Sequence, residues 1–521
     1  MKVKTLFLAI ALFSFTSSIS AAAGDADPTF NSTGKLLTNT PSSNVPPTNL
    51  LEIQPDGKIL AASSAVPPVL WRFNANGTPD ITFGINGKLT LSRFQTVDGL
   101  ALQSDGKILI TGDPSNHQNC QLVRLTANGS IDRTFYSGRG IVITGVSSAS
   151  VGRVIKVQSD GKIVVGGLSV TTAPPDVTTA LVVLRYNPNG SLDKTFSDDG
   201  IAVTAYGLRG YQEPKALLIQ PDGKMILFAV TGYGSFSDRD FTAIRLNSDG
   251  SFDNGFGIQG VTQIADPSME ERPSDAVLLP DGKIILAGAR GSFAVMVRLN
   301  ANGSQDMTFG SGGFAVLAGG ITLYSGALVL RPDGKILVGG EKLVSGVSAF
   351  AVGLYDSDGV LDSSFNVSPE PEQNGFQPLW GTNGIATTSF DQADSVIYSM
   401  AVDAAARVVV SGWSHPLIGG SGYLALARYQ SGSAPFAGIS GTVRTASGLP
   451  IKNTTVVVSG GGLAQPVLTF TNQLGIYFFT DLPVTETYSV SVSSKRFSFA
   501  ADQQNITLNQ NTENVDFTAE P

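Results

Sequence analysis

The sequence contains few of the residue types that carry out most enzyme chemistry. Only one cysteine and two histidines occur among its 521 residues, and charged residues make up 15% of the chain. Because Cys120 is alone, no disulfide forms within the chain, and we expect this residue to be a small buried side chain. His117 and His415 are far apart in the sequence, so no zinc motif with closely spaced histidines exists. The chain also lacks a G-x-S-x-G elbow, a phosphate-binding loop and a dinucleotide-binding glycine motif, which disfavours serine hydrolases and nucleotide-dependent enzymes.

Charge and apolar runs limit the expected partners and location. The formal net charge is -8, so we expect no basic surface for nucleic acid or for an anionic membrane. One apolar run, residues 5–15, follows Lys2 and Lys4 and precedes Ala21-Ala22-Ala23, which is the pattern of a secretory signal peptide. No later run is long enough to span a bilayer. We therefore predict a signal peptide over residues 1–23 with cleavage near Ala23, and a secreted or extracytoplasmic protein without a direct membrane anchor.

A repeat occupies most of the remaining chain. The full pattern is D-x-x-F, a glycine, an apolar segment, D-G-K, a second apolar segment and a turn related to N-x-N-G. We call the Asp and Phe of the first motif the repeat aspartates and repeat phenylalanines; they are Asp27/Phe30, Asp80/Phe83, Asp132/Phe135, Asp193/Phe196, Asp253/Phe256, Asp306/Phe309 and Asp362/Phe365. Their spacing of about 56 residues is somewhat above the usual length of propeller blades and far from the period of helical repeats.

The pattern predicts four β-strands in each repeat. Asp-Gly between apolar segments is a strong hairpin signal, because both residues tolerate positive φ. The segments that follow D-G-K are almost continuously apolar, so we expect strands buried on both faces. We expect each repeat phenylalanine to plug between blades and each repeat aspartate to cap the turn before it. Seven such units predict an all-β protein with a seven-bladed β-propeller over residues 24–433. An open solenoid is the alternative, and we favour the closed ring because the incomplete first copy and the eroded last copy suggest ends that meet.

These motifs resemble the delta-60 repeats of bacterial secreted proteins. The resemblance covers roughly residues 24–433 and departs in the seventh copy, where D-G-K is replaced by Ala405-Ala406-Arg407. It implies a propeller-like domain, and most members of that family have no assigned biochemical activity. An acidic segment with two prolines, residues 366–379, interrupts the last repeat and is expected to form a surface loop.

A second domain follows the repeats. We predict a linker over residues 434–437 and a small β-sandwich over residues 438–521, because short strands alternate there with turn signals. Gly448-Leu449-Pro450-Ile451 and Gly475-Ile476-Tyr477-Phe478-Phe479 resemble carboxypeptidase regulatory-like domains and their Cna B-type relatives. That resemblance implies a stalk, spacer or ligand-contact module and no peptidase activity.

Two sets of repeated polar residues are candidate sites. The turn residues Asp356, Asp358 and Asp362 offer oxygen atoms at alternating positions, which makes them a candidate calcium site; a purely structural turn is the alternative. Six copies keep an arginine inside an apolar strand, and we call these the strand arginines; they are Arg72, Arg124, Arg185, Arg245, Arg298 and Arg428, with Leu354 in the remaining copy. We expect each to form an ion pair with a repeat aspartate, and a ring of arginines that binds an anionic ligand is the alternative.

The pattern as a whole favours a protein that binds rather than catalyses. The recurrent residues are explained as turns, core and blade packing, which predicts no catalytic residue and no cofactor apart from the candidate calcium. We expect an exported, monomeric binding or scaffold protein that presents propeller loops to an extracellular protein or polysaccharide, without nucleic acid. The alternative is an enzyme that acts on extracellular polysaccharide through carboxylates in the propeller funnel.

Overall fold

The computed structural model describes most of the chain. It covers residues 23–42, 50–63, 67–114, 119–147, 149–170, 179–204, 211–232, 239–265, 269–365, 384–390, 393–416, 422–430, 436–461, 463, 466–472, 475–483, 486–508, 512 and 515–520. The predicted signal peptide before Ala23, the predicted loop 366–379 and His117 therefore lie outside the described residues. The described part is all-β, as predicted, and contains no helix with the length and apolar character needed to cross a membrane.

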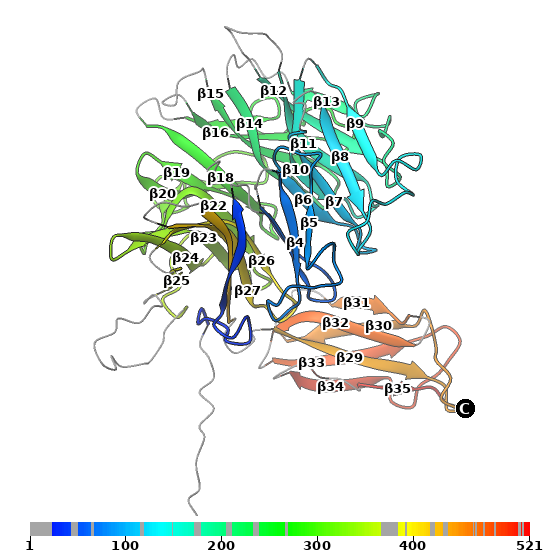
Figure 1. The fold of residues 1–521 in the computed structure, drawn as a ribbon. Helices are drawn as coiled ribbons and strands as arrows, with labels where there is room; N and C mark the ends of the chain where they lie inside the picture. Colours follow the sequence, from blue (N-terminus) through cyan, green and yellow to red (C-terminus); the bar gives the residue numbers. More distant parts are fainter. Residues whose placement is uncertain are drawn as a thin grey trace, which may run out of the picture.

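Strands β1–β28 form seven four-stranded antiparallel sheets, which we call blades one to seven. The first strand of each blade is β2 (Leu50–Ile53), β6 (Gly99–Leu102), β10 (Ala149–Val157), β14 (Tyr211–Ile219), β18 (Glu271–Leu278), β22 (Thr322–Leu330) and β26 (Ala393–Val402). Each of these strands packs on the first strand of the next blade, and β26 packs on β2. The seven sheets therefore form a closed ring, a β-propeller, with the first strands around its centre (Figure 1). We call them the inner strands.

The remaining strands of each blade follow outward in sequence order. The second strands are β3 (Ile59–Ser63), β7 (Ile108–Gly112), β11 (Ile163–Val170), β15 (Met225–Gly232), β19 (Ile284–Arg290), β23 (Ile336–Val344) and β27 (Val408–Pro416). The third strands are β4 (Val69–Phe73), β8 (Cys120–Leu125), β12 (Thr179–Tyr186), β16 (Asp240–Leu246), β20 (Phe293–Leu299), β24 (Val347–Tyr355) and β28 (Gly422–Tyr429). The outer strands are β5 (Lys88–Thr90), β9 (Ile141–Thr144), β13 (Ile201–Thr204), β17 (Val261–Ile264), β21 (Phe314–Val316), β25 (Ile385–Thr388) and β1 (Lys35–Ser42).

Blade seven joins the two ends of the propeller sequence. Its strand order is β1-β28-β27-β26, so the first strand of the chain supplies the outer strand of the last blade. Lys35 and Leu36 pair with Ala427 and Leu426 of β28. In Figure 1 the blue arrow of β1 accordingly lies beside the yellow strands of this blade. The sequence repeat is thus offset from the blade by one strand, which explains why the first copy looks incomplete.

The core of the propeller lies between blades rather than within them. Seven hydrophobic clusters each combine residues of two neighbouring blades; one of them joins β3 and β4 of blade one to β27 and β28 of blade seven. All five residues of β3 and of β7 are buried, which confirms the expectation that these strands are covered on both faces. The small residues of the second strands allow close approach, since a Cβ on Gly412 would lie 2.0 Å from the carbonyl oxygen of Val396.

The C-terminal domain is a separate pair of sheets. One sheet has the order β31-β30-β33-β34 and the other β32-β29-β35. The strands are β29 (Phe436–Arg444), β30 (Thr455–Gly460), β31 (Val467–Phe470), β32 (Ile476–Pro483), β33 (Glu486–Ser493), β34 (Gln503–Leu508) and β35 (Phe517–Thr518). Inward-facing residues of both sheets share one core, which includes Val456, Tyr477, Val490 and Phe517. The predicted sandwich is confirmed, and its first strand already begins at Phe436, inside the predicted linker 434–437.

Candidate functional site

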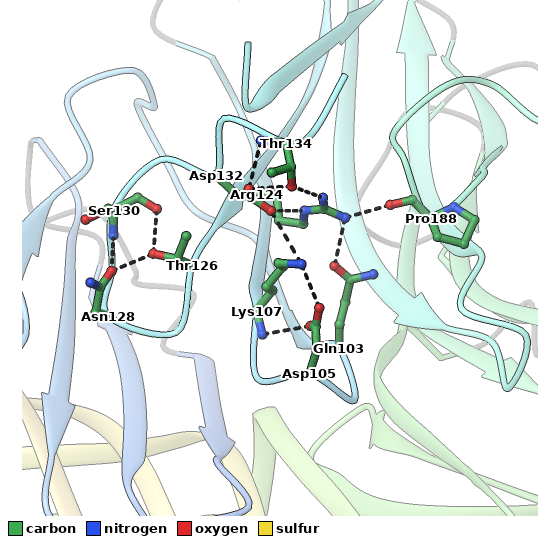
Figure 2. A network of polar contacts seen from close by, with 10 residues as sticks. All are labelled: Gln103, Asp105, Lys107, Arg124, Thr126, Asn128, Ser130, Asp132, Thr134 and Pro188. Atoms are coloured by element: carbon green, nitrogen blue, oxygen red, sulfur yellow. Dashed lines mark hydrogen bonds and ion pairs between the residues drawn. The ribbon is translucent and has the colours of Figure 1, made fainter. Parts of the chain in front are cut away.

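The repeated polar residues form the same contact at six of the seven junctions between neighbouring blades, as shown for Arg124 in Figure 2. Arg124 Nε lies 2.8 Å from Asp132 Oδ2, and both side chains are buried. Its Nη1 donates to the carbonyl oxygen of Pro188, 2.6 Å away in the turn that follows β12 of the next blade. Its guanidinium carbon lies 4.2 Å from the centre of the Phe135 ring. We call this set of an arginine, a repeat aspartate, a repeat phenylalanine and a turn carbonyl the interblade clamp.

All six strand arginines build the same clamp. Their Nε atoms lie 2.6–2.8 Å from the repeat aspartates, in the pairs Arg72–Asp80, Arg124–Asp132, Arg185–Asp193, Arg245–Asp253, Arg298–Asp306 and Arg428–Asp27. The predicted ion pairs are confirmed. The arginines are buried and already paired, so they do not form an open ring for an anionic ligand.

The repeat phenylalanine also joins two blades, as expected. The ring of Phe83 fills the space beside Gly129, where an added Cβ would lie 2.6 Å from a ring atom, and Gly129 has a φ of +88°. Only glycine combines this backbone conformation with room for the ring.

The repeat aspartate caps a different turn from the one expected. Asp132 Oδ1 accepts hydrogen bonds from the backbone N–H and the hydroxyl of Thr134, at 2.9 and 2.7 Å. The expected cap on the preceding turn is therefore wrong, and the carboxylate closes the turn that follows it. The reason is that the repeat aspartate is the first residue of D-x-x-F, where its side-chain oxygen reaches the N–H two residues later.

The D-G-K lysines add a second cation to the clamp. Lys162, Lys224 and Lys283 place Nζ 3.2, 2.9 and 3.0 Å from the repeat aspartate of their own blade. In blade seven Arg407 takes this place, 3.3 Å from Asp27. In blade six Leu354 replaces the strand arginine, and Asp362 Oδ2 forms an ion pair with Lys335 Nζ at 2.5 Å.

The three aspartates of the candidate calcium site each have a protein partner. Asp356 Oδ1 accepts the backbone N–H groups of Asp358 and Val360, both at 2.9 Å. Asp358 Oδ1 lies 2.7 Å from Arg298 Nη1, and Asp362 pairs with Lys335. Within the described residues, no group of three or more His, Cys, Asp or Glu side chains is placed to hold a metal ion. This geometry favours the structural-turn interpretation of the motif.

A set of polar residues that do not recur lies at the centre of the ring. A cavity of about 520 Å³ is lined by residues from all seven inner strands, and we call it the channel. Its charged lining residues are Glu52, Asp98, Lys156, Lys215 and Asp275. At the position of Glu52, counted from D-G-K, the other inner strands carry Lys156 or the apolar residues Ala101, Leu218, Val277, Val329 and Ala401. The sevenfold pattern is therefore broken at the channel.

β-Bulges direct several of these side chains. The pairing register shifts within β10, β14, β18, β22 and β26. Arg153, Lys215, Ser274 and Tyr398 each lie at such a shift. A bulge inserts one residue and re-aims its side chain, so the inner strands present polar groups that a regular strand would place elsewhere.

Asp275 is a carboxyl group of the channel lining that bonds to two backbone N–H groups. Its Oδ2 accepts the backbone N–H of Leu328 on blade six, and its Oδ1 accepts that of Ala276, both at 2.8 Å. It is surrounded by protein while its side chain remains partly accessible from the channel. Burial raises the pKa of Asp275 to about 6 despite the two N–H donors. Burial likewise raises the pKa of Glu52, and the charge of Lys156 opposes this.

A charged cluster connects the inner strands of blades two, three and four; its members are Asp98, Arg153, Tyr211, Glu213 and Lys215. Arg153 Nη1 lies 2.6 Å from Asp98 Oδ2, and its Nε lies 3.6 Å from Glu213 Oε1. Glu213 Oε2 also lies 2.9 Å from Lys215 Nζ and accepts the Tyr211 hydroxyl. Burial acts to raise the pKa of Glu213, but Lys215 and Arg153 outweigh it and hold the pKa below its usual value. The cluster contains both carboxylates and cations, so it suits ligand groups of either charge.

The histidine and cysteine offer no reactive site in the described part. His415 lies in β27 and its ring centre is 5.0 Å from that of Trp413. Cys120 is buried, as expected, and burial raises the pKa of its thiol to about 12. A thiol with such a pKa is protonated at neutral pH and is a poor nucleophile.

Comparison with known families agrees with this architecture. The profile described as a domain of unknown function (DUF5122) beta-propeller matches six segments, residues 54–83, 103–135, 158–196, 220–256, 279–309 and 331–365. Six repeats of the chain match this beta-propeller model. Each matched segment ends at a repeat phenylalanine and, except for the sixth, includes a complete Arg–Asp–Phe set. The carboxypeptidase regulatory-like domain matches residues 438–520, which confirms that part of the predicted resemblance.

Comparisons with individual proteins add little to the family matches. No curated protein matches the chain. Among solved structures, polysaccharide lyase Uly1 aligns over 79% of this chain and 98% of its own, at 9% identity and a TM-score of 0.45. A protein of unknown function from Bacteroides caccae aligns over 61% of this chain and 94% of its own, at 12% identity and a TM-score of 0.33. An endo-arabinase from Bacteroides thetaiotaomicron aligns over 64% of this chain and 93% of its own, at 12% identity and a TM-score of 0.30. At these TM-scores the likeness carries no argument about activity.

Proposed function

We propose that this protein is a non-catalytic binding protein whose propeller channel and adjoining loops contact a protein or glycan. One observation carries the proposal: the strand arginines and their repeat aspartates are engaged in interblade clamps, whereas the charged residues that line the channel differ from blade to blade. In a repeat protein, residues that recur at equivalent positions serve the architecture, and a binding site is expected where the repeats differ.

The channel has both signs of charge together with hydroxyl groups. Lys156 and Lys215 line it beside Asp98 and Asp275, with Tyr398 on blade seven. Such a lining suits a ligand with many hydroxyl or amide groups better than one with a high net charge. We propose an exported, monomeric protein with an extracellular protein or polysaccharide as its partner, and we retain the delta-60 assignment as part of this proposal.

Binding variants in the channel test this function. Lys156→Gln and Lys215→Gln each remove one lining cation, and Lys194→Gln is the control because Lys194 is exposed on the propeller surface. The full chain is screened against glycans and cell-envelope fractions, and affinity is measured for whatever binds. We expect at least tenfold weaker binding for the channel variants, an unchanged affinity for the control, and no turnover of the ligand. Equal affinities for all variants would contradict the proposal.

An enzyme that acts on polysaccharide is the second candidate. The observation that favours it is that burial raises the pKa of both Asp275 and Glu52, and Asp275, with a pKa of about 6, can serve as a proton donor. Release of reducing ends from a glycan panel tests this candidate. Turnover that Glu52→Gln and Asp275→Asn abolish, while both variants keep the thermal stability of the parent, would replace the binding proposal. No turnover across the panel removes the candidate.

A further inference from the structure

The C-terminal domain carries a groove of about 900 Å³ on its surface. The groove lies between the loop that follows β29, the end of β31 and the turn after β33. Backbone hydrogen bonds hold this arrangement: Asn453 N donates to the carbonyl oxygen of Thr471 at 2.9 Å, and Thr454 N donates to the Thr471 hydroxyl at 2.9 Å. Thr471 is buried and its hydroxyl donates to the carbonyl of Ile451 at 2.7 Å. The floor of the groove is therefore fixed by the fold.

The charged residues of the groove are all cations. They are Lys452, Lys495 and Arg496, and no acidic residue lines the groove. Residues 438–521 contain four basic and six acidic residues, so three of the four cations of an otherwise acidic domain meet here. Within the part of the chain that is described, none of the three side chains forms an ion pair or a hydrogen bond. Unpaired cations held together in this way attract an anionic ligand.

Exposed apolar groups lie beside these cations. Phe470 is 59% exposed, Phe497 is 37% exposed and Leu449 is 64% exposed. Large side chains that stay exposed at a concave surface mark ligand grooves. Asn453, Thr455, Ser493 and Ser494 add uncharged polar groups to the same lining.

We propose that this groove binds an anionic polysaccharide. Lys452, Lys495 and Arg496 pair with the carboxylate or sulfate groups of the chain, and Arg496 offers the bidentate geometry that such groups favour. The flat rings of Phe470 and Phe497 contact the apolar faces of sugar rings. The hydroxyl and amide groups of the lining match the many hydroxyls of a glycan, which favours a glycan over an acidic peptide. The site is separate from the propeller channel and stands whether or not the channel binds a ligand.

Charge variants of the full chain test the proposal. The triple variant Lys452→Gln, Lys495→Gln, Arg496→Gln removes the groove cations. The matched control Arg93→Gln, Arg133→Gln, Lys194→Gln removes three exposed cations of the propeller and changes the net charge equally. Calorimetry with polygalacturonate and with dextran sulfate measures affinity at low salt. We expect binding of at least one of the two polymers, with at least tenfold weaker binding in the groove variant and unchanged binding in the control.

Three results would overturn the proposal. They are no binding of either anionic polymer by the parent, an equal affinity of the groove variant, and binding of neutral galactan or polyglutamate as tight as that of the anionic glycans. Equal binding of polyglutamate would assign the groove to acidic peptides instead. Phe470→Ala with Phe497→Ala adds a second readout: at high salt, where ion pairs are screened, this variant should lose most of the remaining glycan binding. If this double variant keeps the full glycan binding of the parent at high salt, the proposed contact between the rings and the sugars is contradicted.

Discussion

Arg428 Nε lies 2.6 Å from Asp27 Oδ2, although the two residues are 401 positions apart in the sequence. Both side chains are buried, and the Arg428 guanidinium carbon lies 5.0 Å from the centre of the Phe30 ring. The same arginine donates to the carbonyl oxygen of Ala75 in blade one. The last repeat and the first residues of the propeller thus share one interblade clamp, which closes the ring together with β1.

Removing the N-terminal part of this contact should open the ring. Deletion of residues 24–42 takes away β1 and Asp27, so β28 becomes an unpaired edge and Arg428 loses its partner. Because exposed edge strands pair with other chains, we expect oligomers or aggregates. Light scattering after size-exclusion chromatography measures this, with a deletion of residues 438–521 as the control that leaves all seven blades intact. A deleted chain that stays monomeric with the parent's unfolding midpoint would contradict the role of β1.

Because each strand arginine is buried, replacing its repeat aspartate should lower the free energy of unfolding strongly. Asp132→Ala leaves the buried Arg124 without its carboxylate, and breaking a buried pair in this way costs about 3–5 kcal/mol. Asp362→Ala is the matched control, because the same turn cap is lost but Leu354 stands in place of the arginine. We expect the free energy of unfolding to fall more for Asp132→Ala, by at least about 2 kcal/mol. Urea unfolding measures both, and equal losses would show that the ion pair adds nothing beyond the cap.

Acid should weaken the propeller through the repeat aspartates. Burial acts to raise the pKa of Asp80 and Asp193, but hydrogen bonds and the neighbouring cations outweigh it and bring the pKa to about 2. The other five repeat aspartates also have lowered pKa values. Since the folded-state pKa lies below the unfolded value of 3.8, this contribution to stability is present above pH 4 and is lost as pH falls toward 2. Urea midpoints between pH 7 and pH 2.5 should drop mainly below pH 4, and less steeply for Asp80→Asn; a constant midpoint would refute the linkage.

Cys120 should be unreactive until the protein unfolds. Its thiol is buried in blade two and burial raises its pKa to about 12, so the thiolate that attacks a disulfide reagent is scarce at pH 8. We expect no colour from a thiol reagent with the native protein and one equivalent per chain in guanidinium chloride. Rapid reaction of the native protein would show that blade two opens readily.

Much of the fold follows from local rules that the sequence displays. Asp56-Gly57 and its equivalents require tight turns, and the apolar segments after them require burial on both faces, which together lead to stacked blades. The arginine in six of the seven third strands also demands a carboxylate, and the repeat aspartate is the available partner. These inferences hold because each requirement appears in six copies of the repeat. The direction of the aspartate cap was wrong, since spacing alone does not say which neighbouring N–H a carboxylate reaches.

The channel was missed because its residues do not recur. Glu52 and Lys156 occupy equivalent positions six residues before the D-G-K lysine, and a comparison of the copies at that position reveals a charge among apolar residues. Arg153 is harder to anticipate, because a bulge sets the direction of its side chain. The groove of the C-terminal domain depends on Lys452 and Lys495 meeting across 43 positions of sequence, which only the folded sandwich reveals.

In each clamp the acceptor on the neighbouring blade is a backbone carbonyl. The identity of the side chain at that position can therefore vary. Ala75, Ala127, Pro188, Ser248, Ala301 and Ser357 fill the position, with no side-chain feature in common. An arginine of one repeat can therefore engage the turn of any other. Tandem duplication of a repeat would supply a working junction at once, so a ring of this kind can arise by copying a single unit and diversify afterwards at its centre.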